Sequence, residues 1–201
     1  LAGFPNAGKS TLLSRLTAAK PKIADYPFTT LAPQLGVVDT FYDGVGSFVI
    51  ADIPGLIEGA SQGRGLGHDF LRHLERTKSI LFILDGFDKL SEEIVEDYEK
   101  LKYELFEFSP DFAQKTFFVA INKKDIFEDL SEVDEAKKIF EEMGLMCFII
   151  SAYTGDGLNN LKIELMKSIE ETKPKLEVLT YHLPVEAPQP KLQITNHAYL
   201  Q

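Results

Sequence analysis

The sequence is poor in cysteine and has no long hydrophobic run. Its 201 residues include one cysteine, Cys147, which lies in the apolar run 145–150. We interpret Cys147 as a small buried hydrophobic residue in a reducing compartment rather than as a reactive thiol. No stretch approaches the roughly 18 apolar residues that a transmembrane helix needs, so we expect no contact with a membrane.

The sequence also has little positive charge and no recognisable leader. It holds 21 lysines and arginines against 31 acids, a formal net charge of −10. Such a surface binds a phosphate backbone poorly, so contact with RNA would need a basic patch or a further domain. The chain starts at Leu1 without an initiator methionine, a basic segment or a signal peptide. Its composition is ordinary for a globular protein. We also expect the chain to be a monomer.

The pattern of apolar residues alternates between strand-like and helix-like segments. Continuous apolar runs at 80–84 and 117–121 are typical of interior parallel strands. Residues 35–42 and 47–52 indicate two strands joined at a hairpin turn. Helical spacing is found in residues 11–18, 94–108, 131–143 and 156–171. We predict an α/β fold with a mostly parallel six-stranded sheet, one antiparallel edge strand and helices on both faces.

We predict one domain over residues 1–172. A buried strand should precede the glycine-rich loop described next, yet only Leu1 and Ala2 do so. We therefore expect that the first strand is truncated. From Pro174 onward prolines interrupt the chain, and no helical or strand period survives. We interpret 173–201 as a linker or tail that is partly extended.

A glycine-rich motif opens the chain and matches the pattern G-x-x-x-x-G-K-[ST]. It consists of Gly3, Phe4, Pro5, Asn6, Ala7, Gly8, Lys9 and Ser10. The two glycines let the backbone curl so that its N–H groups, and the helix that follows, face phosphate oxygens. Lys9 would contact the β- and γ-phosphates, which makes it a catalytic candidate, and the Ser10 hydroxyl would bind Mg²⁺. The motif indicates a nucleoside triphosphate without identifying its base.

A second motif, Asn122, Lys123, Lys124 and Asp125, follows the predicted strand 117–121. The Asp125 carboxylate would accept hydrogen bonds from N1–H and the 2-amino group of guanine, whereas adenine offers neither donor. We predict a preference for guanine of roughly 10²–10⁴. Asn122 would tie this loop to the phosphate loop, and the Lys123 stem would cover one face of the base.

Further candidates follow two other strands. Ser151, Ala152 and Tyr153 end the next apolar run, where the Ala152 N–H would donate to guanine O6. The other group is Asp52, Ile53, Pro54 and Gly55. Asp52 would hold Mg²⁺ through water, and the Gly55 N–H would reach the γ-phosphate, which makes Gly55 a catalytic candidate.

The segment before the predicted strand 35–42 supplies the last group of predicted nucleotide contacts. They are Phe28, Thr29, Thr30, Leu31 and Ala32. A threonine hydroxyl there would complete the Mg²⁺ shell only while the γ-phosphate is present. All these groups lie where parallel strands end, as a nucleotide site at the edge of an α/β sheet requires.

Three longer stretches go beyond these general motifs. They are residues 3–10 continuing to 19–31, with Ala24-Asp25-Tyr26-Pro27-Phe28-Thr29-Thr30, then residues 51–60, and the glycine-rich stretch 63–76. Over about residues 1–170 the chain resembles the Obg family, also called CgtA. The related Drg and YchF-like proteins share part of the pattern and remain alternatives, although Asp125 disfavours an ATPase of the YchF kind.

The resemblance implies a Ras-like P-loop fold and a slow, Mg²⁺-dependent GTPase in the cytoplasm, with Thr30 as the metal ligand and catalytic residue. It also implies GTP and GDP as ligands and a switch role in the assembly of the large ribosomal subunit, reached through regions absent here. It further implies a link to the stress response through guanine nucleotides, guanosine tetraphosphate included. The family's glycine-rich N-terminal domain is not present in this sequence.

Two positions bear on the rate of hydrolysis. Leu56 stands where Ras-like enzymes carry a glutamine that orients water, so hydrolysis should be slow unless another group helps, such as Gln62 or Arg64. Several GTPases with asparagine at the position of Asn6 bind K⁺ beside the phosphates, which leaves K⁺ open as a second ion. The alternative function is a guanine-nucleotide sensor with negligible hydrolysis.

Overall fold

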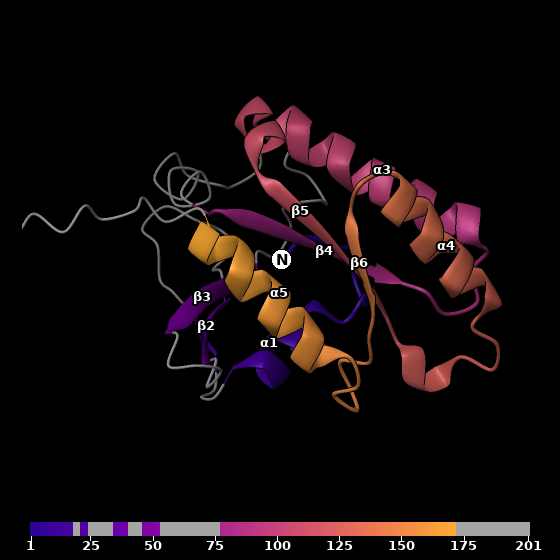
Figure 1. Cartoon of the computed structure of the whole chain (residues 1–201), viewed down its shortest axis with the longest axis horizontal. Helices are drawn as coiled ribbons and strands as arrows, with labels where there is room; N and C mark the ends of the chain where they lie inside the picture. Colours follow the sequence, from indigo (N-terminus) through magenta and orange to yellow (C-terminus); the bar gives the residue numbers. More distant parts are fainter. Residues whose placement is uncertain (18–20, 24–33, 40–45, 53–76, 172–201) are drawn as a thin grey trace, which may run out of the picture.

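A computed structural model describes residues 1–17, 21–23, 34–39, 46–52 and 77–171 (Figure 1). It contains six strands in two hydrogen-bonded groups: β1 (Lys22–Ile23), β2 (Gln34–Asp39) and β3 (Ser47–Asp52), and β4 (Ser79–Asp85), β5 (Thr116–Asn122) and β6 (Met146–Ile149). The second group is parallel throughout, which the continuous apolar runs predicted. In the first group, β2 runs antiparallel to both of its neighbours.

The two groups of strands meet at the start of the chain, in the middle of the molecule (Figure 1). The Ala2 N–H donates to Leu81 O at 2.9 Å, and Ala2 O accepts from the Ile83 N–H at 2.7 Å. On the other side, the Leu1 amino group donates to Ala51 O at 2.6 Å. Leu1 and Ala2 therefore occupy the place of the expected first strand, and two residues provide only one bridge to β4.

The α/β class with a mostly parallel sheet is confirmed, and one detail of the predicted sheet is corrected. The described strands form two three-stranded groups, and the hydrogen bonds of Leu1 and Ala2 link β3 to β4 between them. The antiparallel strand β2 is not an edge strand, since β1 pairs with it through Lys22 and Ile23. A two-residue strand is too short to show a period of two in the sequence.

In the described part of the chain, four α-helices flank the strands: α1 (Lys9–Leu16), α3 (Ser91–Phe108), α4 (Ser131–Glu142) and α5 (Leu158–Glu171). Each coincides with a segment of predicted helical spacing, with ends shifted by up to three residues. Figure 1 shows α3 and α4 on one side of β4–β6, and α1 and α5 on the other. Two short 3₁₀ turns, η2 (Pro110–Gln114) and η3 (Lys124–Ile126), flank β5.

One core layer lies between the strands and the pair α3 and α4. The rings of Phe82 and Tyr98 meet edge to face at 5.0 Å, and those of Tyr98 and Phe140 at 5.3 Å, so aromatic contacts join β4, α3 and α4. Cys147 is buried in this layer, and burial raises the pKa of its thiol to about 12. The interpretation of Cys147 as a buried, unreactive residue agrees with this environment.

The opposite core layer seats the helix that follows the glycine-rich loop. Leu12, Leu13 and Leu16 of α1 are fully buried and belong to the same cluster as Ile83 of β4 and Leu161 of α5. Burial of these side chains fixes α1 against the sheet, and with it the loop at its N-terminus. Within the described ranges, no helix is both long and apolar enough to cross a membrane.

Candidate functional site

The glycine-rich loop runs from Ala2 to the start of α1 and folds back on itself. Asn6 and Gly8 both have positive φ angles, 60° and 99°. Asparagine tolerates this left-handed conformation better than most residues, and glycine adopts it freely. The Lys9 ammonium donates to the carbonyl oxygens of Gly3 and Phe4 at 2.7 and 2.8 Å. The Lys9 side chain therefore folds back across the glycine-rich loop and contacts the first two residues of the motif.

Both glycines of the motif are required by close approach. A Cβ atom at Gly3 would lie 2.5 Å from Ile83 O of β4. A Cβ at Gly8 would lie 2.1 Å from the side-chain nitrogen of Asn122. Contacts this short are repulsive, so the loop can sit against β4 and Asn122 only without these side chains. The motif thus reflects packing in addition to phosphate geometry.

Asn122 connects three segments that are far apart in the sequence. Its Nδ2 atom donates to Ala7 O at 2.8 Å, and its Oδ1 atom accepts from the Ala152 N–H at 2.8 Å. The side chain is 3% exposed, so both bonds are shielded from water. The predicted link is therefore present in the structure: Asn122 joins the base loop (residues 122–125) to the phosphate loop (residues 3–10). The Ala152 N–H is predicted to donate to guanine O6. Because it donates to Asn122 Oδ1 in the structure, it would have to share its hydrogen between the two acceptors.

Asp125 and Ser151 lie against each other. The Ser151 hydroxyl donates to Asp125 Oδ1 at 2.5 Å and accepts from the Thr154 N–H at 3.0 Å. Ser151 is buried, whereas Asp125 is exposed. One edge of the Asp125 carboxylate is thus held in place while the residue stays open to solvent. Tyr153 is exposed, and its carbonyl oxygen accepts a hydrogen bond from Arg15 of α1.

Each lysine of the base loop is paired with its own acid. Lys123 Nζ lies 2.5 Å from Asp85 Oδ2, and Lys124 Nζ lies 2.6 Å from Asp156 Oδ2. The hydrogen bond from Lys124 lowers the pKa of the Asp156 carboxyl. Sequence reasoning missed both acids. A signal existed for Asp85, because it ends an apolar strand in the same way as Asn122 does.

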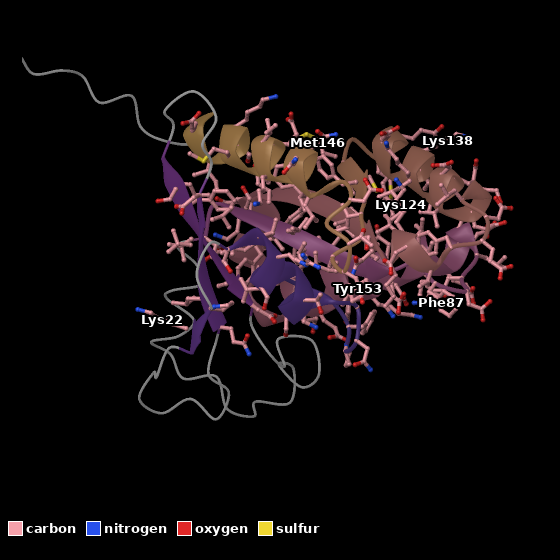
Figure 2. The ribbon with its side chains drawn as sticks, turned by 90° about the horizontal axis from the view of Figure 1, so that it is seen from below. Lys22, Phe87, Lys124, Lys138, Met146 and Tyr153 are labelled. Carbon is pink, nitrogen blue, oxygen red and sulfur yellow. The ribbon has the colours of Figure 1, made fainter. Side chains whose placement is uncertain are left out.

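The figure places the loops that follow the parallel strands. In Figure 2 the labelled Phe87, Lys124 and Tyr153, from the loops after β4, β5 and β6, all lie well away from Lys22 of β1. This arrangement follows from parallel strands, whose carboxyl ends share one edge of the sheet. The hydrogen bonds from Ser151 to Asp125 and from Ala152 to Asn122 show that the loops after β5 and β6 meet.

The predicted metal corner contains Ser10 and Asp52. The Ser10 hydroxyl donates to Asp52 Oδ2 at 3.0 Å. Asp52 is 3% exposed, and its Oδ1 atom is buried with no hydrogen-bond partner among the described residues. A buried carboxylate oxygen without a partner is costly. A hydrated Mg²⁺ ion takes oxygen ligands and would satisfy it, so the residues present fit this cation.

The remaining predicted site residues lie outside the described residues. They are Phe28, Thr29, Thr30, Leu31, Ala32, Ile53, Pro54 and Gly55, together with Leu56, Gln62 and Arg64. The described part of the chain holds no group of three or more His, Cys, Asp or Glu side chains that would bind a metal. A cation here would rely on few protein ligands and on substrate phosphates, as Mg²⁺ commonly does.

Comparison with known proteins agrees with this geometry. A family profile described as 50S ribosome-binding GTPase matches residues 1–123. The chain belongs to this family. GTPase Obg of Aquifex aeolicus is 53% identical over 175 residues, which cover 87% of this chain and 50% of that protein. GTPase Obg of a Thermoanaerobacter species is 46% identical over 204 residues, which cover 99% of this chain and 48% of that protein.

The chain is thus a homologue of Obg, as the motifs predicted, and a member of the 50S ribosome-binding GTPase family that spans about half the length of these relatives. Era of Aquifex aeolicus, crystallised with GDP and AlF₄⁻, superposes with a TM-score of 0.55 at 25% identity, over 83% of this chain and 54% of that one. The G domain of the T. maritima FeoB iron transporter gives 0.53 at 23% identity, over 84% and 95%, and shows the shared fold.

Proposed function

We propose that this chain is the G domain of an Obg-type GTPase, which binds GTP and GDP together with Mg²⁺ and hydrolyses GTP slowly. The observation that carries the proposal is the junction at Asn122, which holds the phosphate loop and the Ser151–Ala152 segment in one site. Asp125 stands beside this junction with one carboxylate oxygen anchored by Ser151. This arrangement supports the proposed recognition of a guanine nucleotide.

The phosphate side is proposed from the glycine-rich loop and the metal corner. The loop's N–H groups, the start of α1 and Lys9 would hold the β- and γ-phosphates. Ser10 would bind Mg²⁺ directly and Asp52 through water, which their shared hydrogen bond supports. The cation would neutralise charge on the phosphate oxygens. Thr30 and Gly55 are proposed from the sequence to bind the cation and the γ-phosphate in the GTP state.

The rate of hydrolysis is proposed to be low. Leu56 has no polar atom in its side chain with which to orient water, so turnover without a partner is expected at about 10⁻³ s⁻¹ or below. Asn6 stands in the loop with a left-handed backbone and is exposed. We propose it as the residue beside which K⁺ would bind.

The cellular role is proposed from the family and its relatives. The profile describes 50S ribosome-binding GTPases, and the relatives are GTPases named Obg. A cytoplasmic switch in large-subunit assembly, responsive to guanosine tetraphosphate, is the role that we propose for the whole protein. Residues 1–172 would form the G domain and 173–201 a linker or tail. The net charge of −10 favours ribosome contact through other regions.

A sensor with negligible hydrolysis is the second candidate, which Leu56 favours. Single-turnover GTP hydrolysis, measured with and without large ribosomal subunits, separates the two. Acceleration by the subunits supports the enzyme. Hydrolysis below detection under both conditions, with normal GTP binding, supports the sensor.

The binding part of the proposal is tested by titrating GTP, GDP and ATP in the presence of Mg²⁺. We expect tight binding of both guanine nucleotides and a loss of roughly 10²–10⁴ in affinity for ATP. Equal affinity for ATP and GTP would overturn the assignment of Asp125.

A further inference from the structure

The ion pair between Lys123 and Asp85 joins the base loop to the end of β4, which supplies none of the predicted site residues. Asp85 is the last residue of β4 and pairs in register with Asn122, the last residue of β5. Its carboxylate therefore stands at the same sheet edge as the base loop. The two side chains are 26% and 29% exposed, so the pair is half-buried. Screening by water is weaker there than at an open surface.

Both oxygens of the Asp85 carboxylate have partners. Oδ1 accepts from the Phe87 N–H at 3.1 Å, and Oδ2 accepts from Lys123 Nζ at 2.5 Å. The residue between them, Gly86, is packed closely, since a Cβ there would lie 2.7 Å from the Ile121 side chain. The direction of the carboxylate is therefore set by a backbone with little room to move.

Lys123 has an unusual backbone conformation for its type. Its φ and ψ angles are 74° and 28°, in the left-handed region. A residue other than glycine persists there only where its surroundings hold it. Asn122 is held on one side by two buried hydrogen bonds, and the ammonium of Lys123 is held by Asp85. The four-carbon stem is thus fixed at both ends, which leaves an apolar surface of defined position.

We propose that Asp85 is a positioning residue for the nucleotide: it anchors the Lys123 ammonium so that the lysine stem covers one face of the base. The proposal rests on the proposed function, because it assumes that a guanine base occupies the site. Asp85 would hold the lysine stem that lies over the face of the base, and it would not contact the hydrogen-bonding edge of the base. It should therefore set how tightly a purine is held, while Asp125 reads the N1–H and the 2-amino group of guanine.

The experiment measures the dissociation rate of a fluorescent GDP analogue. Asp85→Asn keeps an acceptor for the Phe87 N–H and removes the charge. We expect dissociation to become about 3- to 10-fold faster, which suits a half-buried ion pair. In a Lys123→Met background, where no ammonium remains to be held, the same substitution should change the rate less than about 2-fold.

The matched control is Asp97→Asn. Asp97 pairs with Lys89, the side chains being 19% and 30% exposed, so its burial resembles that of the Asp85 pair, but it lies on α3. We expect GDP dissociation to be unchanged in this variant. The ratio of the affinities for GDP and inosine diphosphate, which lacks the 2-amino group, should also be the same in Asp85→Asn as in the unsubstituted chain.

Three results would overturn the proposal. These are unchanged dissociation from Asp85→Asn, equal acceleration in both lysine backgrounds, and a shifted GDP to inosine diphosphate ratio. Lys123→Met alone should speed dissociation at least as much, and its failure to do so would overturn the proposal even without a folded Asp85 variant. Failure of the proposed function looks different, since the unsubstituted chain would then not bind GDP at all.

Discussion

The base-binding side of the site and its metal corner differ in how far the protein satisfies its own polar groups. On the base side, Asn122 bonds to Ala7 and Ala152, Asp125 accepts from Ser151, and Lys123 has its own acid. In the metal corner, Asp52 has one bond, from Ser10, and a second buried oxygen that has no partner among the described residues.

This difference separates two ways of preparing a binding site. The base side is preorganised, because its side chains are held in place before any ligand arrives, which lowers the cost of binding. In the metal corner, one buried Asp52 oxygen has no partner among the described residues, which is where we propose that a hydrated cation binds. Binding of the nucleotide with Mg²⁺ should therefore stabilise the fold mainly through Asp52 and Ser10, and removing Mg²⁺ should affect that corner more than the base side.

The largest effect is expected where the base side reads the nucleotide. Asp125→Asn replaces an acceptor with a group that can donate to the C2 oxygen of xanthine. We expect the preference for GTP over xanthosine triphosphate to fall by about 10²–10⁴. Titration of both nucleotides measures it, with Asp129→Asn as a control, because Asp129 lies in the same loop but bonds to Ser131. An unchanged preference would remove Asp125 from the pocket.

A smaller effect is expected in the metal corner. Asp52→Asn removes the carboxylate that would hold a water of Mg²⁺, and loss of such an outer partner typically weakens metal affinity by about 10–100-fold. The Mg²⁺ concentration needed for half-maximal GDP binding measures it, while GDP affinity in a chelator should be unchanged. The melting temperature without nucleotide should not fall, since a buried charge is removed.

The exposed Asp39 at the end of β2 provides the control for this change. Asp39→Asn should leave the Mg²⁺ requirement unaltered. If both variants show the same requirement as the unsubstituted chain, the cation does not sit near Asp52.

The junction between the two sides is tested at Gly8. Gly8→Ala forces alanine into φ 99° and places a Cβ 2.1 Å from Asn122 Nδ2, so the link between the loops must break. We expect a loss of roughly 2–4 kcal/mol in the free energy of unfolding, from backbone strain and a lost buried hydrogen bond. Gly144→Ala is the matched control, because Gly144 also has a positive φ, 79°, but nothing described lies within 4 Å.

Gly144→Ala should cost only the strain, about 1 kcal/mol. Chemical denaturation measures both variants. Equal losses would show that Asn122 moves aside without cost and that the junction is not rigid.

The site residues that could be predicted from the sequence are those that belong to contiguous motifs. The glycine-rich loop and the residues after β5 and β6 are short patterns, and parallel strands bring their ends together. The pairing of Lys123 with Asp85 could not be predicted, because it depends on the register in which Asp85 faces Asn122, a residue far away in the sequence. The strand β1 was missed because two residues carry no period.

The smallest effect is expected from K⁺, and it concerns the loop between the two sides. If Asn6 helps to hold a monovalent ion beside the phosphates, replacing Na⁺ by K⁺ at constant ionic strength should speed single-turnover hydrolysis by about fivefold, or roughly 1 kcal/mol of barrier. The physical reason is that a cation there stabilises the negative charge that develops on the leaving oxygen.

Asn6→Ala is expected to abolish the K⁺ response while GTP affinity stays nearly intact, because the N–H groups of the loop still hold the phosphates. Alanine at φ 60° adds some strain, so Asn6→Gly serves as the control that removes the side chain without it. Both variants should lose the response equally. Equal rates in Na⁺ and K⁺ for the unsubstituted chain, with normal GTP binding, would exclude the ion. The slow step would then depend on a residue of the segment 53–76 or on a partner, because the exposed Asn6 side chain would have no role in the reaction.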